Sequence, residues 1–186
     1  MSPRRGLDLG IIVAAATEIA DTVGFEEITL ASLASRLGVR SPSLYNHVDG
    51  LPALKSHLVT HGLNQLNEAI KAASGTNQTR GKIIAIADAY LLFARNHPGL
   101  YELTLRAPTA EQPEQMRLGS EIVESLVAAL SIYKSSEEKA VHAVRGLRSI
   151  LHGFASIEKS GGFGMALEVN DSITFVLNSF LNGLEE

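Results

Sequence analysis

The feature that most constrains the fold of this chain is one short segment, residues 28–48, with the sequence ITLASLASRLGVRSPSLYNHV. Thr29 is a favourable N-cap for a helix over about residues 30–37, whose apolar residues recur at helical spacing. Gly38 follows, and glycine readily adopts the left-handed conformation that ends such a helix. A second short helix is expected over about residues 42–47. The segment therefore predicts two short helices joined by a tight turn.

The second short helix has little to bury, because only Leu44 and Val48 are expected to point inward. Its start is marked by Ser41 as the predicted cap and by Pro42 in the first turn. Its other side chains carry hydroxyl, amide, phenol and imidazole groups, which suit hydrogen bonds to phosphates and base edges. Such a pair of helices is a helix-turn-helix, which places its second helix in the major groove of DNA. The alternative is a surface helix hairpin with ordinary polar residues.

The composition of the chain favours helices and excludes several kinds of site. Of its 186 residues 45% are hydrophobic and none is cysteine, so neither a disulfide nor a thiolate metal site can form. The net charge of −4 argues against non-specific coating of nucleic acid, although a specific DNA reader needs only a local basic surface. The sequence shows no signal peptide and no apolar run near the ~20 residues of a membrane span. We therefore expect a soluble, cytoplasmic protein.

Helical spacing of apolar residues continues through the rest of the chain, without any strand period. Further helices are expected over residues 8–23, 51–73, 82–97, 100–106, 114–132, 136–159 and 169–184. Together with the two short helices, they predict an all-α fold of about nine helices. Residues 1–50 would form a three-helix head, and residues 51–186 a helical-bundle body.

Residues 9–54 resemble the N-terminal domain of the TetR/AcrR family of transcriptional regulators. The elements that carry the resemblance are the lead-in GFEEIT, then LASRLGV and SPSLYNHV, and finally DGLPAL at the start of the next helix. The resemblance implies a helix-turn-helix DNA-binding domain over residues 1–50 and an effector-binding, dimerising body over residues 51–186. It implies a sequence-specific regulator, by default a repressor that a small-molecule effector releases from its double-stranded DNA operator.

The same resemblance implies which side chains contact DNA. Thr29, at the start of the first short helix, would contact phosphate. The first residues of the second short helix would face the major groove. Arg40 occupies a variable position, at which an arginine can read guanine or hold phosphate. Leu51 stands where many members carry a phosphate-binding lysine, and nearby cations are expected to compensate. The predicted DNA-contacting residues are Arg4, Arg5, Thr29, Arg40, Ser41, Pro42, Ser43, Tyr45, Asn46, His47 and Lys55.

The last helix indicates a homodimer. Its apolar stripe is wide and needs cover on more than one side, which a two-fold partner or the core of the same chain could supply. A short recognition helix also contacts only a few base pairs, so specific binding requires two half-sites. The predicted interface residues are Ile173, Val176, Leu177, Phe180, Leu181 and Leu184.

Residues 148–164, RSILHGFASIEKSGGFG, resemble a subclass of the family's C-terminal domains that is marked by a His-Gly pair. The polar residues that share one quadrant of this helix are His142, Arg145, Ser149, His152 and Ser156. This polar stripe could meet an anionic effector, form a seam between protomers, or face solvent. The predicted effector-pocket residues are His61, Tyr90, Phe93, Tyr101, Met116, His142, Arg145 and His152.

Three other functions have weaker support. His57 and His61 lie four residues apart and could chelate Zn²⁺ in a metal-responsive regulator, but HLVTH lacks the glutamate of a zinc protease. A helical protein–protein adaptor would show exposed leucine or methionine where this chain places serines beside an arginine. The sequence contains no catalytic cysteine, nucleophile elbow, phosphate-binding glycine loop or dinucleotide fingerprint. Neither an enzyme nor a cofactor is therefore expected.

Overall fold

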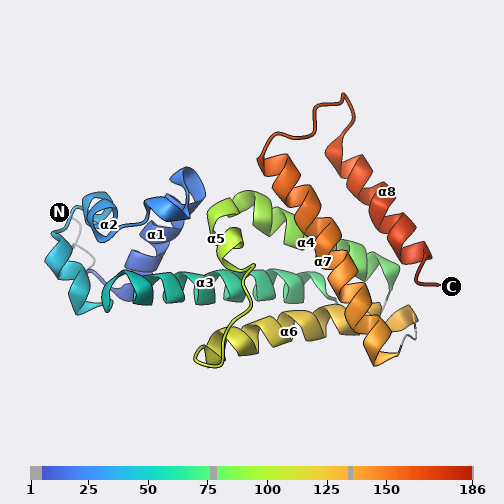
Figure 1. The fold of residues 1–186 in the computed structure, drawn as a ribbon, viewed down its shortest axis with the longest axis horizontal. Coiled ribbons are helices and arrows are strands. Elements are labelled where there is room, and N and C mark those ends of the chain that lie inside the picture. Colours follow the sequence, from blue (N-terminus) through green and yellow to red (C-terminus); the bar gives the residue numbers. More distant parts are fainter. Residues whose placement is uncertain (1–5, 76–78, 134–135, 186) are drawn as a thin grey trace. The chain divides into compact units, whose positions relative to one another are not determined.

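The computed structural model of the chain is all-helical over the residues that it describes, which are 6–75, 79–133 and 136–185 (Figure 1). The α-helices are α1 (Leu9–Val23), α2 (Leu30–Leu37), α3 (Gly50–Ala73), α4 (Arg80–Asn96), α5 (Pro98–Leu103), α6 (Pro113–Leu130), α7 (Glu137–Lys159) and α8 (Val169–Asn182). Short 3-10 helices occupy Phe25–Glu27 (η1), Ser41–Asn46 (η2) and Ser131–Tyr133 (η3). Each helix expected from the sequence corresponds to one of these elements, so the predicted all-α class is confirmed. Within the described ranges, no helix has the length and apolar character needed to cross a membrane.

The described residues form two compact units. Unit 1 contains the chain up to Gln65 together with Asn96–Met116, and unit 2 contains Leu66–Arg95 together with residues 117–185. The boundary expected near residue 50 therefore falls inside unit 1. Helices α3 and α6 contribute residues to both units, and α4 contributes its last residue, Asn96, to unit 1.

The core of unit 1 is built around α1, which packs against α2 and α5. Ile12 and Ala16 of α1 and Leu33 of α2 are completely inaccessible to solvent. Asp21, at the end of α1, accepts hydrogen bonds from the backbone N–H groups of Gly99 and Leu100, each at 3.0 Å. These contacts satisfy N–H groups that the first turn of α5 cannot pair internally, so α1 serves as the cap of α5.

The contact between α1 and α5 requires a glycine. A Cβ atom added at Gly99 would lie 2.0 Å from the backbone oxygen of Ala20. That approach is far shorter than van der Waals contact, and a backbone oxygen within a helix cannot move aside. No residue with a side chain can therefore occupy position 99 while α1 and α5 keep this spacing.

The core of unit 2 includes the packing of α7 against α8. Leu147 and Leu151 of α7 and Ile173 and Leu177 of α8 are buried. Arg80, at the start of α4, donates hydrogen bonds of 2.9 Å to both the backbone and side-chain oxygens of Asn178 in α8. The apolar contact and the arginine bridge together fix α8 within unit 2.

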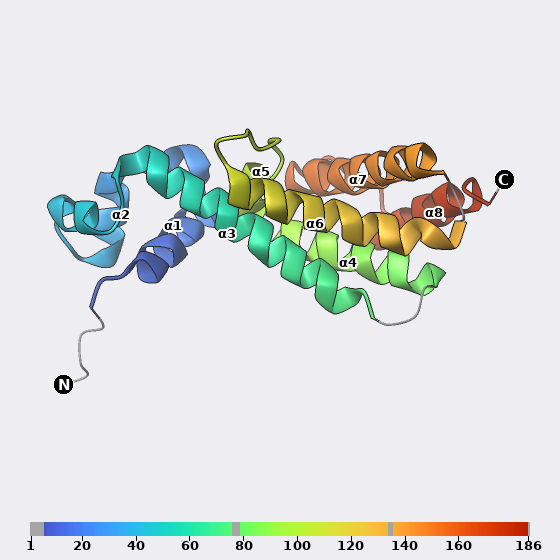
Figure 2. The ribbon, with the colours of Figure 1, turned by 90° about the horizontal axis from the view of Figure 1, so that it is seen from below.

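A second polar network joins the later part of α3 to α6, which lie side by side (Figure 2). Glu121 accepts hydrogen bonds from the side chains of Lys71, at 2.6 Å, and Asn67, at 2.8 Å. Arg117, one turn away on α6, forms an ion pair with the same carboxylate. The hydrogen bonds from Lys71 and Asn67 lower the pKa of Glu121 from 4.5 to about 2, so the group is ionised at neutral pH.

We predict that Gly99→Ala destabilises unit 1. Because the added methyl group meets backbone, the substitution should lower the free energy of unfolding by about 2 kcal/mol or more. The matched control is Gly119→Ala in α6, where a Cβ meets no atom within 4 Å. That control should gain about 0.5–1 kcal/mol from helix propensity. Urea titrations of both variants test this, and equal midpoints would contradict the close approach of α1 and α5.

We predict that Glu121→Gln makes the protein less stable at pH 7 but not near pH 2. The pKa of Glu121 is depressed on folding, so its stabilisation is fully present above about pH 4.5 and is lost as the pH falls toward 2. Melting temperatures of the wild type and the variant should therefore converge over that interval. A gap in melting temperature that stays constant from pH 7 to pH 2 would show that the carboxylate network does not act as described.

Candidate nucleic-acid interface

The start of α2 lies at the surface and is capped by its own sequence. The Thr29 hydroxyl accepts a hydrogen bond from the backbone N–H of Ser32, and the Ser32 hydroxyl accepts one from the backbone N–H of Thr29, both at 3.0 Å. This reciprocal capping box confirms Thr29 as the N-cap. Thr29 is exposed, so the amino end of the helix, where backbone N–H groups and the helix dipole favour an anion, faces solvent.

The turn after α2 has the predicted left-handed glycine. Gly38 has φ 65° and ψ 30°, and the backbone N–H of Val39 donates to the oxygen of Ala34 at 3.0 Å. Such a termination reverses the chain within a few residues. It delivers the chain directly to the second helix of the helix-turn-helix.

The second helix is a 3-10 helix, and Ser41 does not cap it. The N-cap is Arg40, and no side chain caps this end. The backbone N–H of Ser43 donates to the oxygen of Arg40 at 2.9 Å, and that of His47 donates to Leu44 at 3.0 Å. Both bonds span three residues, as expected for a six-residue segment that is too short to propagate an α-helix. The prediction of Ser41 as the cap was wrong because it placed the helix start one residue too late.

The second helix is anchored by two apolar residues and exposes most of the rest. Leu44 is completely buried and Val48 is 3% exposed, whereas Tyr45 is 59% exposed. The other exposed residues of this segment are Arg40, Pro42, Asn46 and His47, and the half-buried ones are Ser41 and Ser43. The structure thus places the predicted DNA-contacting side chains of η2 along one anchored segment that is accessible from outside.

Of the predicted cations Arg4, Arg5 and Lys55, the structure describes only Lys55. The Lys55 ammonium lies 4.3 Å from the centre of the Phe25 ring, a cation–π contact that fixes this charge near the start of α3. Arg4 and Arg5 lie outside the described residues. Arg36 of α2 is paired with Glu18 of α1, so this arginine is committed to a contact within unit 1.

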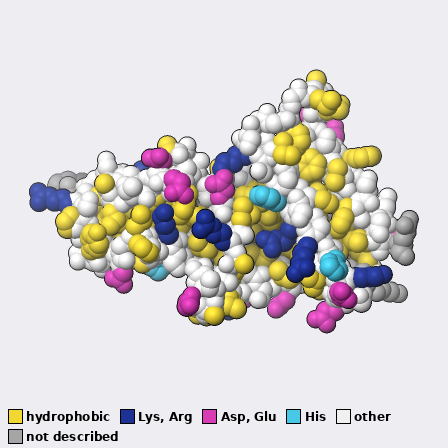
Figure 3. Space-filling view, viewed as in Figure 1, with side chains coloured by type: hydrophobic (Ala, Val, Ile, Leu, Met, Phe, Trp, Pro, Cys, Tyr) yellow, Lys and Arg dark blue, Asp and Glu magenta, His cyan; other side chains and the backbone are white. Residues whose placement is uncertain are grey.

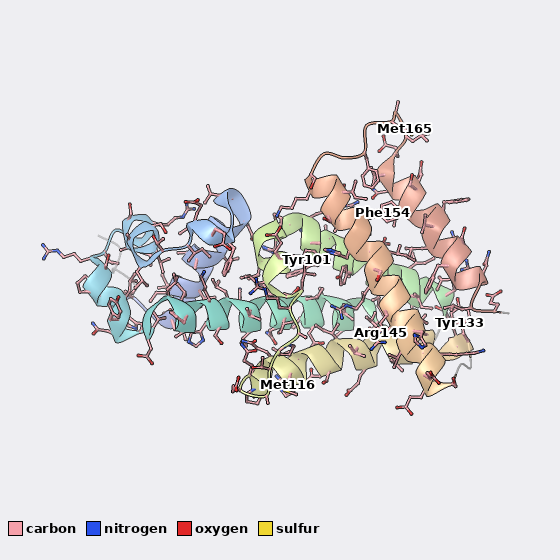
Figure 4. All side chains as sticks on the ribbon, in the orientation of Figure 1. Tyr101, Met116, Tyr133, Arg145, Phe154 and Met165 are labelled. Carbon is pink, nitrogen blue, oxygen red and sulfur yellow. The ribbon has the colours of Figure 1, made fainter. Side chains whose placement is uncertain are left out.

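The predicted effector-pocket residues divide into buried and exposed sets. Tyr90 and Phe93 are buried in unit 2, and Tyr101, labelled in Figure 4, is buried in unit 1. His61 is half-buried, and its Nε2 lies 2.9 Å from the side-chain nitrogen of Gln65. The remaining predicted pocket residues are Met116, which is 45% exposed, and His142, Arg145 and His152, which are also exposed.

The polar stripe on α7 lies on the exposed side of that helix in the single chain. The helix buries the opposite side, through Val144, Leu147 and Leu151. His142 and Arg145 therefore point away from the interior of unit 2, and Arg145 projects outward from α7 in Figure 4. Met116 is also exposed, and its place in the effector pocket stays a prediction.

Half of the predicted dimer interface is already covered within the chain. Ile173, Leu177 and Leu181 are at most 3% exposed, so they cannot meet a partner without unfolding of this packing. Val176, Phe180 and Leu184 are half-buried. Sequence reasoning missed the most exposed apolar residues of this region, which are Met165 at 82%, Leu167 at 74% and Phe175 at 71%. Phe175 lies two residues from Ile173, which places it on the opposite side of α8 from the predicted stripe.

The residues proposed for a metal site are not joined by a third ligand. His57 is exposed and His61 is half-buried on α3. In the described parts of the chain, no three or more histidine, cysteine, aspartate or glutamate side chains gather as a metal site would require.

A surface-exposed capped helix, a glycine turn and a short anchored helix define a helix-turn-helix DNA-binding protein. Comparison with known proteins agrees. The family model described as "Tetracyclin repressor-like, C-terminal domain" matches residues 83–180. The chain is 38% identical to the HTH-type transcriptional regulator YobS of Bacillus subtilis, over 99% of this chain and 96% of that protein. The chain therefore belongs to the tetracycline-repressor-like (TetR) family of transcriptional regulators, and is a DNA-binding regulator rather than an enzyme.

More distant relatives were found by sequence and by structure. The regulator Rv0681 of Mycobacterium tuberculosis is 30% identical over 81% of this chain and 69% of that protein. A protein of unknown function from Rhodococcus sp. RHA1 superposes with a TM-score of 0.82 at 22% identity, over the full length of both chains. TetR from Acinetobacter baumannii superposes with a TM-score of 0.70 at 20% identity, over 97% of both chains. These structural matches support the fold alone.

We predict that Tyr45→Ala weakens specific DNA binding without loss of stability. Tyr45 is 59% exposed, so its removal should change the free energy of unfolding by less than about 0.5 kcal/mol. Affinity for a fragment that the wild type selects from genomic DNA should fall at least about tenfold in gel-shift titrations, the scale of one lost base contact. Arg36→Ala is the control, because Arg36 is paired with Glu18. Unchanged binding by Tyr45→Ala would contradict the placement of η2 against DNA.

Proposed function

We propose that this protein is a homodimeric repressor that a small-molecule effector releases from a pseudo-palindromic operator. The observation that carries the proposal is the exposure of Arg40, Tyr45, Asn46 and His47 on a segment anchored by Leu44. A further relative, from Streptomyces coeruleorubidus, is called the transcriptional repressor DrrR1 and is 31% identical over 57% of this chain and 38% of that protein. Its name supports repression rather than activation.

In the proposed complex, η2 enters the major groove and α2 approaches the backbone with its amino end. The Arg40 guanidinium can donate two hydrogen bonds to a guanine edge, and the amide of Asn46 can pair with adenine. The N–H groups at the start of α2, beside Thr29, suit a phosphate. The imidazole of His47 and the ammonium of Lys55 add contacts to the backbone. Reading and positioning groups thus come from different elements of unit 1.

A homodimer would present this surface twice. One six-residue helix reads only a few base pairs, so specificity requires a second half-site about one helical turn away. The proposed interface is the apolar surface of α8 and of the chain before it, formed by Met165, Leu167 and Phe175. Figure 3 shows hydrophobic side chains gathered along α7, α8 and their connection, and Figure 4 places Met165 on that connection.

Effector binding is proposed for the interior of unit 2, beside the buried aromatic residues Tyr90 and Phe93. The crystal structure of an Acinetobacter baumannii TetR variant in complex with minocycline is similar to this chain, at 21% identity and a TM-score of 0.69, with 97% of each chain covered. Helix α3 contributes residues to both units, so a shift of α3 in unit 2 would alter unit 1. An effector that prefers the shifted state would reduce the affinity for the operator.

Repression is tested in cells with a reporter behind a genomic fragment that the purified protein selects. Deletion of the gene should raise reporter expression, and Tyr45→Ala expressed in the deletion strain should fail to lower it again. Lower expression after deletion would identify an activator and overturn the proposal of repression.

We predict that Phe175→Asp dissociates the dimer. Phe175 is 71% exposed in one chain, so an acidic residue there should leave the fold intact but be costly at an apolar interface. The matched control is Leu92→Asp on α4, where Leu92 is 57% exposed. Sedimentation at micromolar concentration should show a dimer for the wild type and control, and a monomer for Phe175→Asp. A dimeric Phe175→Asp variant would exclude this surface as the interface.

A further inference from the structure

The side chain of Asn67, in unit 2, has a buried polar atom without a hydrogen-bond partner among the described residues. Asn67 of α3 is 2% exposed, and its side-chain nitrogen donates to Glu121 at 2.8 Å. Its side-chain oxygen, Oδ1, is inaccessible to solvent and receives no hydrogen bond from the described residues. A buried acceptor of this kind costs on the order of 1–3 kcal/mol unless a donor reaches it. The amide is therefore only half satisfied by the protein itself.

The orientation of the Asn67 amide is determined by its neighbour. Glu121 carries a negative charge, which Lys71 and Arg117 stabilise, and an ionised carboxylate can only accept hydrogen bonds. The amide must therefore present its nitrogen to Glu121, and a rotation that exchanged nitrogen and oxygen would set two acceptors against each other. Oδ1 consequently remains the acceptor that points away from the carboxylate.

The residues that flank this contact along both helices are apolar. Leu66 and Ile70 lie beside Asn67 on α3, and Leu118 and Ile122 lie beside Glu121 on α6, each at most 5% exposed. Apart from the charged network on its nitrogen side, the Asn67 amide therefore lies among buried apolar positions of the two helices. Ligand sites commonly combine an apolar lining with a few such fixed polar groups.

We propose that Asn67 recognises the effector, by accepting a hydrogen bond at Oδ1 from an uncharged hydroxyl or N–H group on an otherwise apolar molecule. The inference rests on the proposed effector binding in unit 2 and names the chemical class of the effector. A cationic donor is disfavoured because Lys71 and Arg117 lie beside the same carboxylate. An anion is disfavoured because it would oppose its own acceptor atoms to Oδ1.

The inference is tested with two probes of similar size, phenol and toluene, on the full-length protein. Only phenol carries a donor, so calorimetric titration should show phenol binding about five- to tenfold more tightly than toluene, the effect of one neutral hydrogen bond. In nitrogen-15 NMR spectra, phenol should shift the side-chain NH₂ signal of Asn67, which is assigned by its disappearance in Asn67→Leu. Toluene should leave that signal within line width of its starting position.

Substitutions of Asn67 distinguish a hydrogen bond to its amide from general binding of apolar molecules. Asn67→Leu and the smaller Asn67→Ser should bind phenol and toluene within about twofold of each other, since the acceptor is removed or displaced. Asn96→Leu is the matched control, because Asn96 is exposed at the end of α4, and it should keep the preference for phenol. The NMR measurement on the wild type remains decisive if either core variant fails to fold.

The inference is overturned if phenol and toluene bind the wild type equally, if neither binds, or if the preference survives in Asn67→Leu. Equal binding without an NMR shift is also the result expected when a tightly held water satisfies Oδ1. Gel shifts on the same preparations distinguish this failure from failure of the proposed function. A protein that binds its selected DNA fragment but shows no phenol preference loses only the role of Asn67, whereas one that binds no DNA loses the proposed repressor function.

Discussion

The burial of Leu44 is the interaction on which the DNA-facing surface depends. A six-residue 3-10 helix has too few hydrogen bonds to be stable alone, so its position comes from tertiary packing. Leu44 is completely buried and Val48 nearly so, and these two contacts anchor the segment within η2 and just after its end. Every other side chain of the segment is then free to be chosen for recognition. Stability and DNA reading are thus assigned to different residues of the same short element.

The polar groups inside the two units also differ in role, because some are fully paired and stabilise the fold whereas another keeps an atom for a ligand. Asp21 is fully engaged, because its carboxylate caps α5 and lies 2.8 Å from Nδ1 of His97. Glu121 is likewise engaged by three donors. Asn67 differs, since one of its two polar atoms has a partner and the other does not. Satisfied networks hold a fold in one arrangement, and an unsatisfied buried atom gives a ligand a specific contact to complete.

Sequence features that depend on near neighbours predicted the helices well. The errors concern which side of a helix packs against distant parts of the chain. The cap at Thr29 and the left-handed Gly38 depend on neighbours within a few residues, so they were visible in the sequence. The side of a helix that is covered depends on distant elements, so periodicity identified the stripe through Ile173 and Leu177 without showing that α7 covers it. The bond between Asn67 and Glu121 joins residues 54 positions apart and leaves no local pattern.

The most direct test of the account is a hydroxyl-radical footprint of the wild-type protein on a DNA fragment that it selects. Two copies of the η2 surface in a symmetric dimer predict two protected tracts, related by a pseudo-two-fold axis, with centres about 10 base pairs apart or a multiple of that spacing. A single protected tract, or uniform protection along the fragment, would contradict paired reading of DNA by the segment that Leu44 anchors.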